Sequence, residues 1–91
     1  MFKKSEIYSI DRKYFTVIIT NEYDITIMSN NTKHVWNLHS VEMLPNNLII
    51  VFHKHHLSDT YHRHLKCVSF NKAIKEIKKH DIFQLNGRQT M

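Results

Sequence analysis

The sequence predicts an α+β domain in which an antiparallel sheet of about five strands packs against one C-terminal helix. Three observations favour this fold. Short runs of β-branched and aromatic residues recur along the chain, turn residues separate them, and helical spacing of apolar residues follows the last run. With 91 residues and no repeat or linker, the chain is expected to form a single domain over residues 1–91.

The first three strands are expected over residues 14–20, 23–29 and 33–39. Their β-branched and aromatic side chains suit a pleated sheet. Turns at Asn21-Glu22 and Asn30-Asn31 would join them as two hairpins, and Asn suits the second turn because it tolerates positive φ.

Pairing across the second of these turns places Ile25 opposite Trp36 and Ile27 opposite His34. By alternation, one face of the two strands holds these side chains and two more: Tyr23 and Leu38. This face is expected to be core. Trp36 is therefore interpreted as a core residue rather than an exposed binding anchor.

Two more strands are expected after the break at Pro45, over residues 48–56 and 61–69. The five consecutive apolar residues 48–52 predict a central strand that is covered on both faces. A two-residue turn centred on Ser58-Asp59 would join this strand to the next one.

Five histidines fall within twelve residues around this turn: His53, His55, His56, His62 and His64. The turn would pair His55 with His62 and His53 with His64, and directly opposed Cβ atoms lie about 5 Å apart. Because imidazole is a good ligand for zinc, copper and nickel, these four residues are predicted to bind a metal, with zinc the expected ion. The competing interpretation is that the histidines line the solvated face of a hairpin.

The ligand set depends on the register, because a loop longer by one residue would move one strand's histidines to the other face. His56 and Cys67 have the opposite parity and are the alternative ligands. Asp59, Cys67 or water can also supply a fourth ligand, since structural sites made only of histidine are less common than mixed ones.

The helix is expected to begin at a cap residue, Ser69 or Asn71, and its apolar positions follow helical spacing: Phe70, Ala73, Ile74 and Ile77. The opposite surface carries four lysines: Lys72, Lys75, Lys78 and Lys79. In the tail, residues 81–91, the apolar side chains Ile82, Phe83 and Leu85 are expected to add an edge strand or to pack across the sheet. Fraying is expected from Gly87 onward.

Catalytic motifs are missing from the sequence. It contains no HExxH, no GxSxG and no glycine-rich phosphate loop, and a single glycine makes a phosphate cradle implausible. Spacing places none of the carboxylates Glu42, Asp59 and Asp81 beside the histidines as a general base. Cys67 is interpreted as a buried structural thiol. The chain is therefore not expected to be an enzyme, and its metal is expected to be structural.

Charge and composition limit the partners. The formal net charge is +5, which favours polyanions or acidic protein surfaces. No membrane span or signal peptide is evident, and one cysteine suits a reducing compartment, so a cytoplasmic location in a bacterial host cell is expected. Nucleic-acid binding is the alternative function, because Tyr61 and Arg63 interleave with the histidines on the opposite face.

The HKHH and YHRH segments, together with small size and an Ile-, Lys- and Asn-rich composition, resemble a type II-A anti-CRISPR protein of the metal-containing kind. The resemblance implies a phage-encoded inhibitor that binds Cas9 stoichiometrically and blocks guide or target-DNA loading. Since the chain is basic rather than a DNA mimic, it would dock on an acidic surface of Cas9 as a monomer. Lys72, Lys75, Lys78 and Lys79 are the first candidate contact, against the alternative that they are only solvated.

Overall fold

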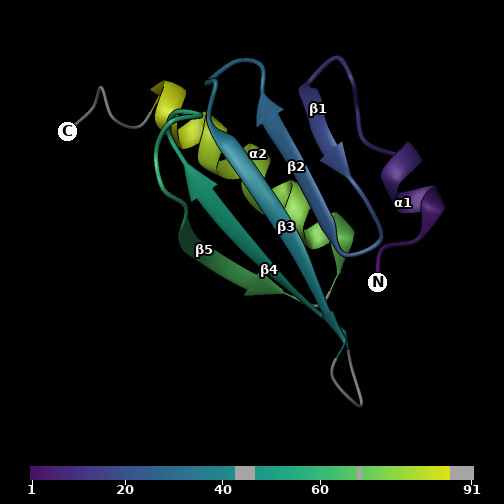
Figure 1. The fold of residues 1–91 in the computed structure, drawn as a ribbon. Helices are drawn as coiled ribbons and strands as arrows, with labels where there is room; N and C mark the ends of the chain where they lie inside the picture. The colour runs from purple at the N-terminus through teal and green to yellow at the C-terminus, as the bar shows by residue number, and fades with distance from the viewer. Residues whose placement is uncertain (43–46, 68, 87–91) are drawn as a thin grey trace.

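The computed structural model describes residues 1–42, 47–67 and 69–86. It contains a five-stranded antiparallel sheet in which strands adjacent in sequence are adjacent in space (Figure 1). The elements are, in chain order, α1 (Lys4–Tyr8), β1 (Phe15–Thr20), β2 (Asp24–Ser29), β3 (Val35–Glu42), β4 (Asn47–Lys54), β5 (His62–Cys67) and α2 (Phe70–Asn86).

The predicted fold class, an antiparallel sheet with a C-terminal helix packed on it, is confirmed. In Figure 1, α2 runs behind the sheet, and α1 lies beside the edge strand β1. We call the side under α2 the covered face and the other side the open face. No helix in the described part of the chain is long and apolar enough to cross a membrane.

The pairing of β2 with β3 corrects the predicted register by two residues, because Ile25 lies opposite Leu38 and Ile27 opposite Trp36. The turn is centred one residue later than expected, since Ser29 N–H donates to the His34 carbonyl at 3.0 Å. Because side chains alternate between the faces of a strand, a shift of two residues leaves every side chain on its expected face. The expected core face is therefore confirmed for four residues, which are fully buried: Ile25, Ile27, Trp36 and Leu38. Tyr23 is exposed instead.

The turn of the β4–β5 hairpin is also displaced by one residue from its predicted position, but in the opposite direction. Asp59 N–H donates to the His56 carbonyl at 3.0 Å, which centres the turn one residue earlier than Ser58-Asp59. Pairing of His55 with His62 and of His53 with His64 is therefore wrong, and His53 lies opposite His62.

A β-bulge then follows in β5. Phe52 pairs with Arg63, whereas Val51 pairs with Leu65, so His64 is an extra residue without a partner on β4. Leu65 packs against the hydrophobic core, and the ring of His64 meets the edge of Trp36 at a centroid distance of 5.3 Å. The bulge therefore directs two consecutive side chains to the covered face.

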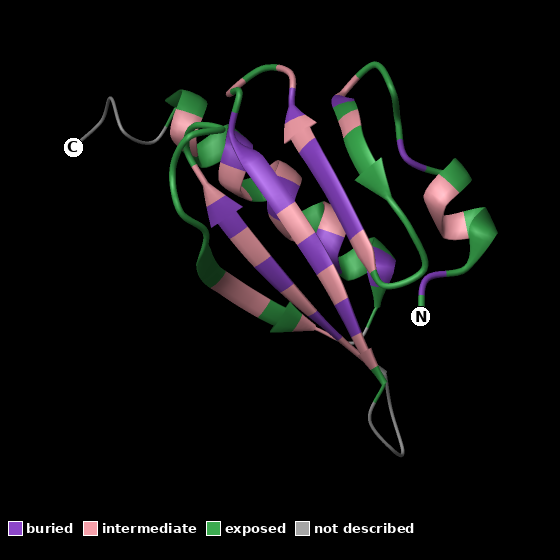
Figure 2. Ribbon diagram, in the orientation of Figure 1, coloured by how far each residue is buried: buried purple, intermediate pink, exposed green. Residues whose placement is uncertain are grey.

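The core lies between the sheet and α2, and Figure 2 shows buried residues alternating with partly exposed ones along the central strands. On β4, residues 49, 51 and 53 are buried, but Leu48, Ile50 and Phe52 are only partly buried. The expectation that β4 is covered on both faces is therefore wrong, because only one face has a helix over it. The break expected at Pro45 lies outside the described residues.

α2 begins after Ser69, whose hydroxyl accepts a hydrogen bond from Lys72 N–H at 3.0 Å and caps the first turn. Phe70, Ala73 and Ile77 are buried as predicted. The helix continues to Asn86, so the expected tail strand is wrong. The three apolar side chains of that expected tail lie exposed on the last turns of α2: Ile82, Phe83 and Leu85. The fraying expected from Gly87 lies outside the described residues.

Candidate metal centre

Six histidines gather on the covered face, between the sheet and the C-terminal half of α2. They come from the residue before β3, from β4, the loop after it, β5 and α2: His34, His53, His55, His62, His64 and His80. The hairpin supplies four of them, while His34 and His80 arrive from distant parts of the chain.

Three of these side chains form the centre of the group. One ligand atom of each of His34, His53 and His80 lies within 4.8 Å of the others. His53 and His34 are almost completely buried, at 2% and 8% exposure, and His80 is partly buried. Imidazole nitrogen is a common ligand for transition metals, so this buried cluster could hold a metal ion.

His53 occupies the middle of the group, with each ring nitrogen facing a different histidine. Its Nε2 lies 3.0 Å from His34 Nδ1, and its Nδ1 lies 3.4 Å from His62 Nε2. Nitrogen ligands of a tetrahedral zinc ion, each about 2.0–2.1 Å from the metal, are separated by about 3.4 Å. Because one imidazole offers only one of its nitrogens to a given ion, the 3.0 Å separation of His53 Nε2 from His34 Nδ1 is the one that approaches this spacing, and His62 lies at the other nitrogen of His53.

Two further rings complete the surroundings. The His64 ring centroid lies 4.9 Å from that of His80 and 5.6 Å from that of His53, so the bulged residue borders the central three. His55 stacks on His34 with a centroid distance of 4.4 Å and an interplanar angle of 10°. These two rings therefore extend the cluster beyond the central three.

The protein holds the central rings rigidly. His53 stacks on the buried indole of Trp36 at a centroid distance of 4.1 Å, and Trp36 in turn donates its Nε1–H to Ser29 Oγ at 3.2 Å. His34 follows Lys33, which adopts a left-handed conformation with φ of 65° in the β2–β3 turn. The strand register and this turn therefore fix the two sheet-side rings.

His80 is positioned through its neighbour Asp81, whose side chain is completely buried. The Asp81 carboxylate accepts hydrogen bonds from Tyr14 Oη at 2.8 Å and from Thr32 Oγ1 at 3.0 Å. These bonds tie the end of α2 to the start of β1 and to the turn before His34. Burial, reinforced by Asp81, raises the pKa of Tyr14 to about 12, so Tyr14 remains a donor.

Burial also keeps the central histidines uncharged in the metal-free protein. It lowers the pKa of His53 to about 3, and the neighbouring rings of His80 and His34 act in the same direction. The pKa values of His34, His64 and His80 are lowered as well, with burial again the main cause. Neutral imidazole is the form that binds metals, so the cluster needs to release few protons to accept an ion.

The structure brings the rings of the four predicted ligands near one another without testing the ligand set. His53 belongs to the central three, and ring contacts connect it directly to the other predicted ligands: His55, His62 and His64. The set of four stays a prediction.

The alternative ligands lie elsewhere. His56 is exposed in the loop, and its backbone N–H donates a hydrogen bond to Asp59 Oδ2 at 3.2 Å. The Cys67 thiol lies 3.5 Å from the Ser69 carbonyl, and burial raises the pKa of this thiol. Within residues 1–42, 47–67 and 69–86, none of the three joins the central group.

Sequence reasoning missed His34 and His80 as candidate ligands. The expected pairing of His34 with Ile27 has the correct face but is two residues out of register. His80 follows Ile77 by three positions and so continues the buried stripe of α2, a signal that the assignment of residues 81–91 to a tail obscured.

Comparison with protein-family models, curated proteins and solved structures finds no match to this chain.

Proposed function

We propose that this chain is a small zinc-binding protein in which the ion is a structural link between α2 and the sheet. The observation that carries the proposal is the convergence of His34, His53 and His80 within 4.8 Å from three separate segments. An ion bound by all three would connect the β2–β3 turn, β4 and the helix. Such a link stabilises the fold directly, because the unfolded chain has no preformed site.

Zinc is favoured by the chemistry of the ligands. Neutral nitrogen donors suit zinc, copper and nickel, whereas magnesium and calcium prefer oxygen. The cluster offers enough imidazoles for four ligands if His64 joins the central three. Nickel and copper share the nitrogen preference, so competition among these ions tests the assignment.

A structural role is favoured over a catalytic one by the position of the only buried carboxylate in the described chain, Asp81. Both of its oxygens accept hydrogen bonds, one from Tyr14 and one from Thr32, so it is committed to holding the helix. A hydrolytic zinc site needs a general base and an open coordination position. His53, at the middle of the cluster, is instead only 2% exposed.

Metal analysis of the protein purified without a polyhistidine tag tests this proposal. We expect about one zinc per chain, with the stoichiometry abolished by His53→Ala and by the double substitution His34→Ala/His80→Ala. His39→Ala is the matched control, because His39 lies on the open face beside Asp24. Wild-type protein without stoichiometric metal, or loss of metal in the control, would contradict the proposal.

For the wider role we retain the proposal that the chain is a stoichiometric inhibitor of Cas9, which rests on the resemblance of the HKHH and YHRH segments. Titration of Cas9 cleavage should end at a fixed molar ratio, and inactivation of many Cas9 molecules by one chain would contradict it. Lys75 and Lys79 are exposed on α2. Reversing both charges should weaken Cas9 binding if the helix forms the contact, and unchanged binding at physiological salt would place the contact on the sheet.

A further inference from the structure

The open face of the sheet combines basic and aromatic side chains on β4 and β5 with polar side chains on β2 and β3. Cross-strand pairing defines two rows on this face. The first row runs across four strands through Thr26, Asn37, Phe52 and Arg63. The second row runs through Asp24, His39, Ile50 and Lys66.

Positive charge is concentrated on the β4–β5 half of this face. Arg63 and Lys66 are exposed, and Lys54 is partly exposed at the end of β4. Neither β4 nor β5 contains an Asp or a Glu. Among the residues that the structure describes, these three cations form no ion pair. A negatively charged ligand would therefore meet no carboxylate along these two strands.

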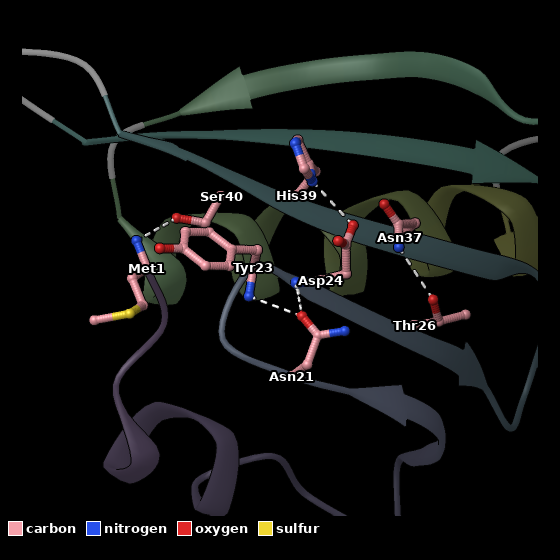
Figure 3. Close-up of polar contacts among 8 residues, drawn as sticks. All are labelled: Met1, Asn21, Tyr23, Asp24, Thr26, Asn37, His39 and Ser40. Carbon is pink, nitrogen blue, oxygen red and sulfur yellow. Dashed lines mark hydrogen bonds and ion pairs between the residues drawn. The ribbon is translucent and has the colours of Figure 1, made fainter.

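The carboxylate on the open face belongs to β2, away from the basic strands β4 and β5, and it contacts a histidine on β3. Asp24 on β2 lies 2.9 Å from His39 Nδ1, and Asn37 donates to Thr26 Oγ1 at 3.0 Å (Figure 3). These contacts order the polar groups of β2 and β3 beside the basic strands. The face is thus divided into a paired polar half and a basic half.

Aromatic rings lie within the basic half. Phe52 is partly exposed between Asn37 and Arg63, its two cross-strand partners. Tyr61 precedes β5 and is 38% exposed, with Lys54 Nζ 4.2 Å from the centre of its ring. Lys54 Nζ also donates to the Leu57 carbonyl at 2.9 Å, which fixes the ammonium over the ring. A cation beside an exposed aromatic ring suits a ligand that carries both phosphates and planar bases.

We propose that this open face binds single-stranded nucleic acid. Arg63, Lys66 and Lys54 would contact phosphates, and bases would stack on Phe52 and Tyr61. An acidic peptide would satisfy the same charges, but every nucleotide carries both a phosphate and a planar aromatic base, which favours nucleic acid for a surface that combines cations with rings. The surface lies opposite the histidine cluster, so the proposal stands independently of metal binding.

Fluorescence anisotropy with the full chain and labelled twelve-nucleotide oligothymidylate and oligouridylate tests the proposal. We expect saturable binding whose affinity falls as salt rises, with a logarithmic slope of about −2 for three phosphate contacts on a single strand. Arg63→Glu/Lys66→Glu should weaken binding by tenfold or more and make the slope shallower. Phe52→Leu, which keeps an apolar side chain but removes the ring, should weaken binding by about tenfold at constant slope.

Lys72→Glu/Lys75→Glu is the matched control, because it makes the same change in net charge on the exposed surface of α2. Its affinity should stay within about threefold of wild type at physiological salt, where the Debye length is about 8 Å. Equal losses of affinity in the two double variants would show that binding depends only on net charge, and this result would overturn the proposal. A labelled polyglutamate peptide that binds as tightly as the oligonucleotides, or no binding by either oligonucleotide, would also overturn it. Thermal unfolding of each variant confirms that the fold is intact.

Discussion

The two faces of the sheet carry different chemistry although the residues responsible are interleaved in the sequence. Six of the eight histidines lie on the covered face, leaving His39 on the open face and His56 in a loop. Along β5, His62 turns toward α2 while Arg63 turns away. This basic, histidine-rich stretch therefore contributes to two surfaces, because alternation along the strand separates the histidines of the proposed metal site from the cations of the proposed nucleic-acid surface.

Removing the metal should produce the largest effect and should act through the covered face alone. Ligand at a thousandfold excess over its Kd stabilises a protein by about 4 kcal/mol. For a domain of this size, that corresponds to a rise in Tm on the order of 20 °C. We expect this difference between zinc-loaded and chelated wild-type protein in thermal unfolding.

The comparison becomes sharper with substitutions on each face. His34→Ala/His80→Ala should show no zinc-dependent change in Tm, whereas His39→Ala should retain the full change. A chelator that leaves the wild-type Tm unaltered would show that the histidines are a packed cluster without a metal.

Asp81→Ala should have the next largest effect, because it leaves two buried hydroxyl groups without an acceptor. Tyr14 and Thr32 donate to this carboxylate, and the Asp81 side chain is completely buried. We expect a loss of about 3 kcal/mol in the free energy of unfolding, measured with urea on metal-free protein.

Tyr14→Phe is the control for this measurement, since it removes one donor and leaves the other bond in place. Its loss should be about 1 kcal/mol. Equal losses in the two variants would mean that Asp81 contributes through Tyr14 alone.

Acid should destabilise the metal-free protein through the covered face. His53 titrates at a pKa near 6.5 when unfolded but at a pKa of about 3 when folded, so the unfolded chain binds the proton first as pH falls. Stability is therefore complete above about pH 6.5 and declines toward pH 3, by at most about 1.4 kcal/mol per pH unit for one histidine.

Urea unfolding at pH 7.5 and pH 5.5 in the presence of chelator measures this decline. His53→Phe, which cannot titrate, should show a shallower dependence than wild type. The lowered pKa values of His34, His64 and His80 act in the same sense, so the variant should keep part of the slope. Identical stability of wild-type protein at the two pH values would contradict the prediction.

Substitutions on the open face should have the smallest effect on stability. Arg63→Ala and Lys66→Ala remove exposed cations that form no ion pair among the described residues. We expect changes within about 0.5 kcal/mol and an unaltered affinity for zinc. Loss of zinc binding in either variant would show that the two faces are coupled through β5.

The sequence predicted the fold class and most of the core because alternation and helical spacing survive small errors in register. Each of the two later turns is centred one residue from its expected position, which moves the pairing next to the turn by two residues and preserves the face there, although the bulge in β5 changes the parity beyond His64. Ile25 and Trp36 are buried for that reason even though they are not directly paired.

The site was predicted less completely because it is assembled by tertiary packing. His53 belongs to a local pattern and was found, whereas His80 reaches the cluster only because α2 crosses the sheet at a particular angle. Spacing within one hairpin contains no information about that crossing. The bulge was not predictable either, since residues 62–67 show no glycine or other signal for an extra residue.

The bulge at His64 adds a histidine to the cluster without altering the rest of the β4–β5 pairing. Arg63 and Leu65 keep their partners on β4, so His64 is an insertion that ordinary pairing does not need. One added codon at this position supplies a fourth imidazole without changing which face any other side chain occupies. One deleted codon removes it equally cleanly. In evolutionary terms, the number of imidazoles beside the central three can change in a single step while the fold and the opposite surface remain as they were.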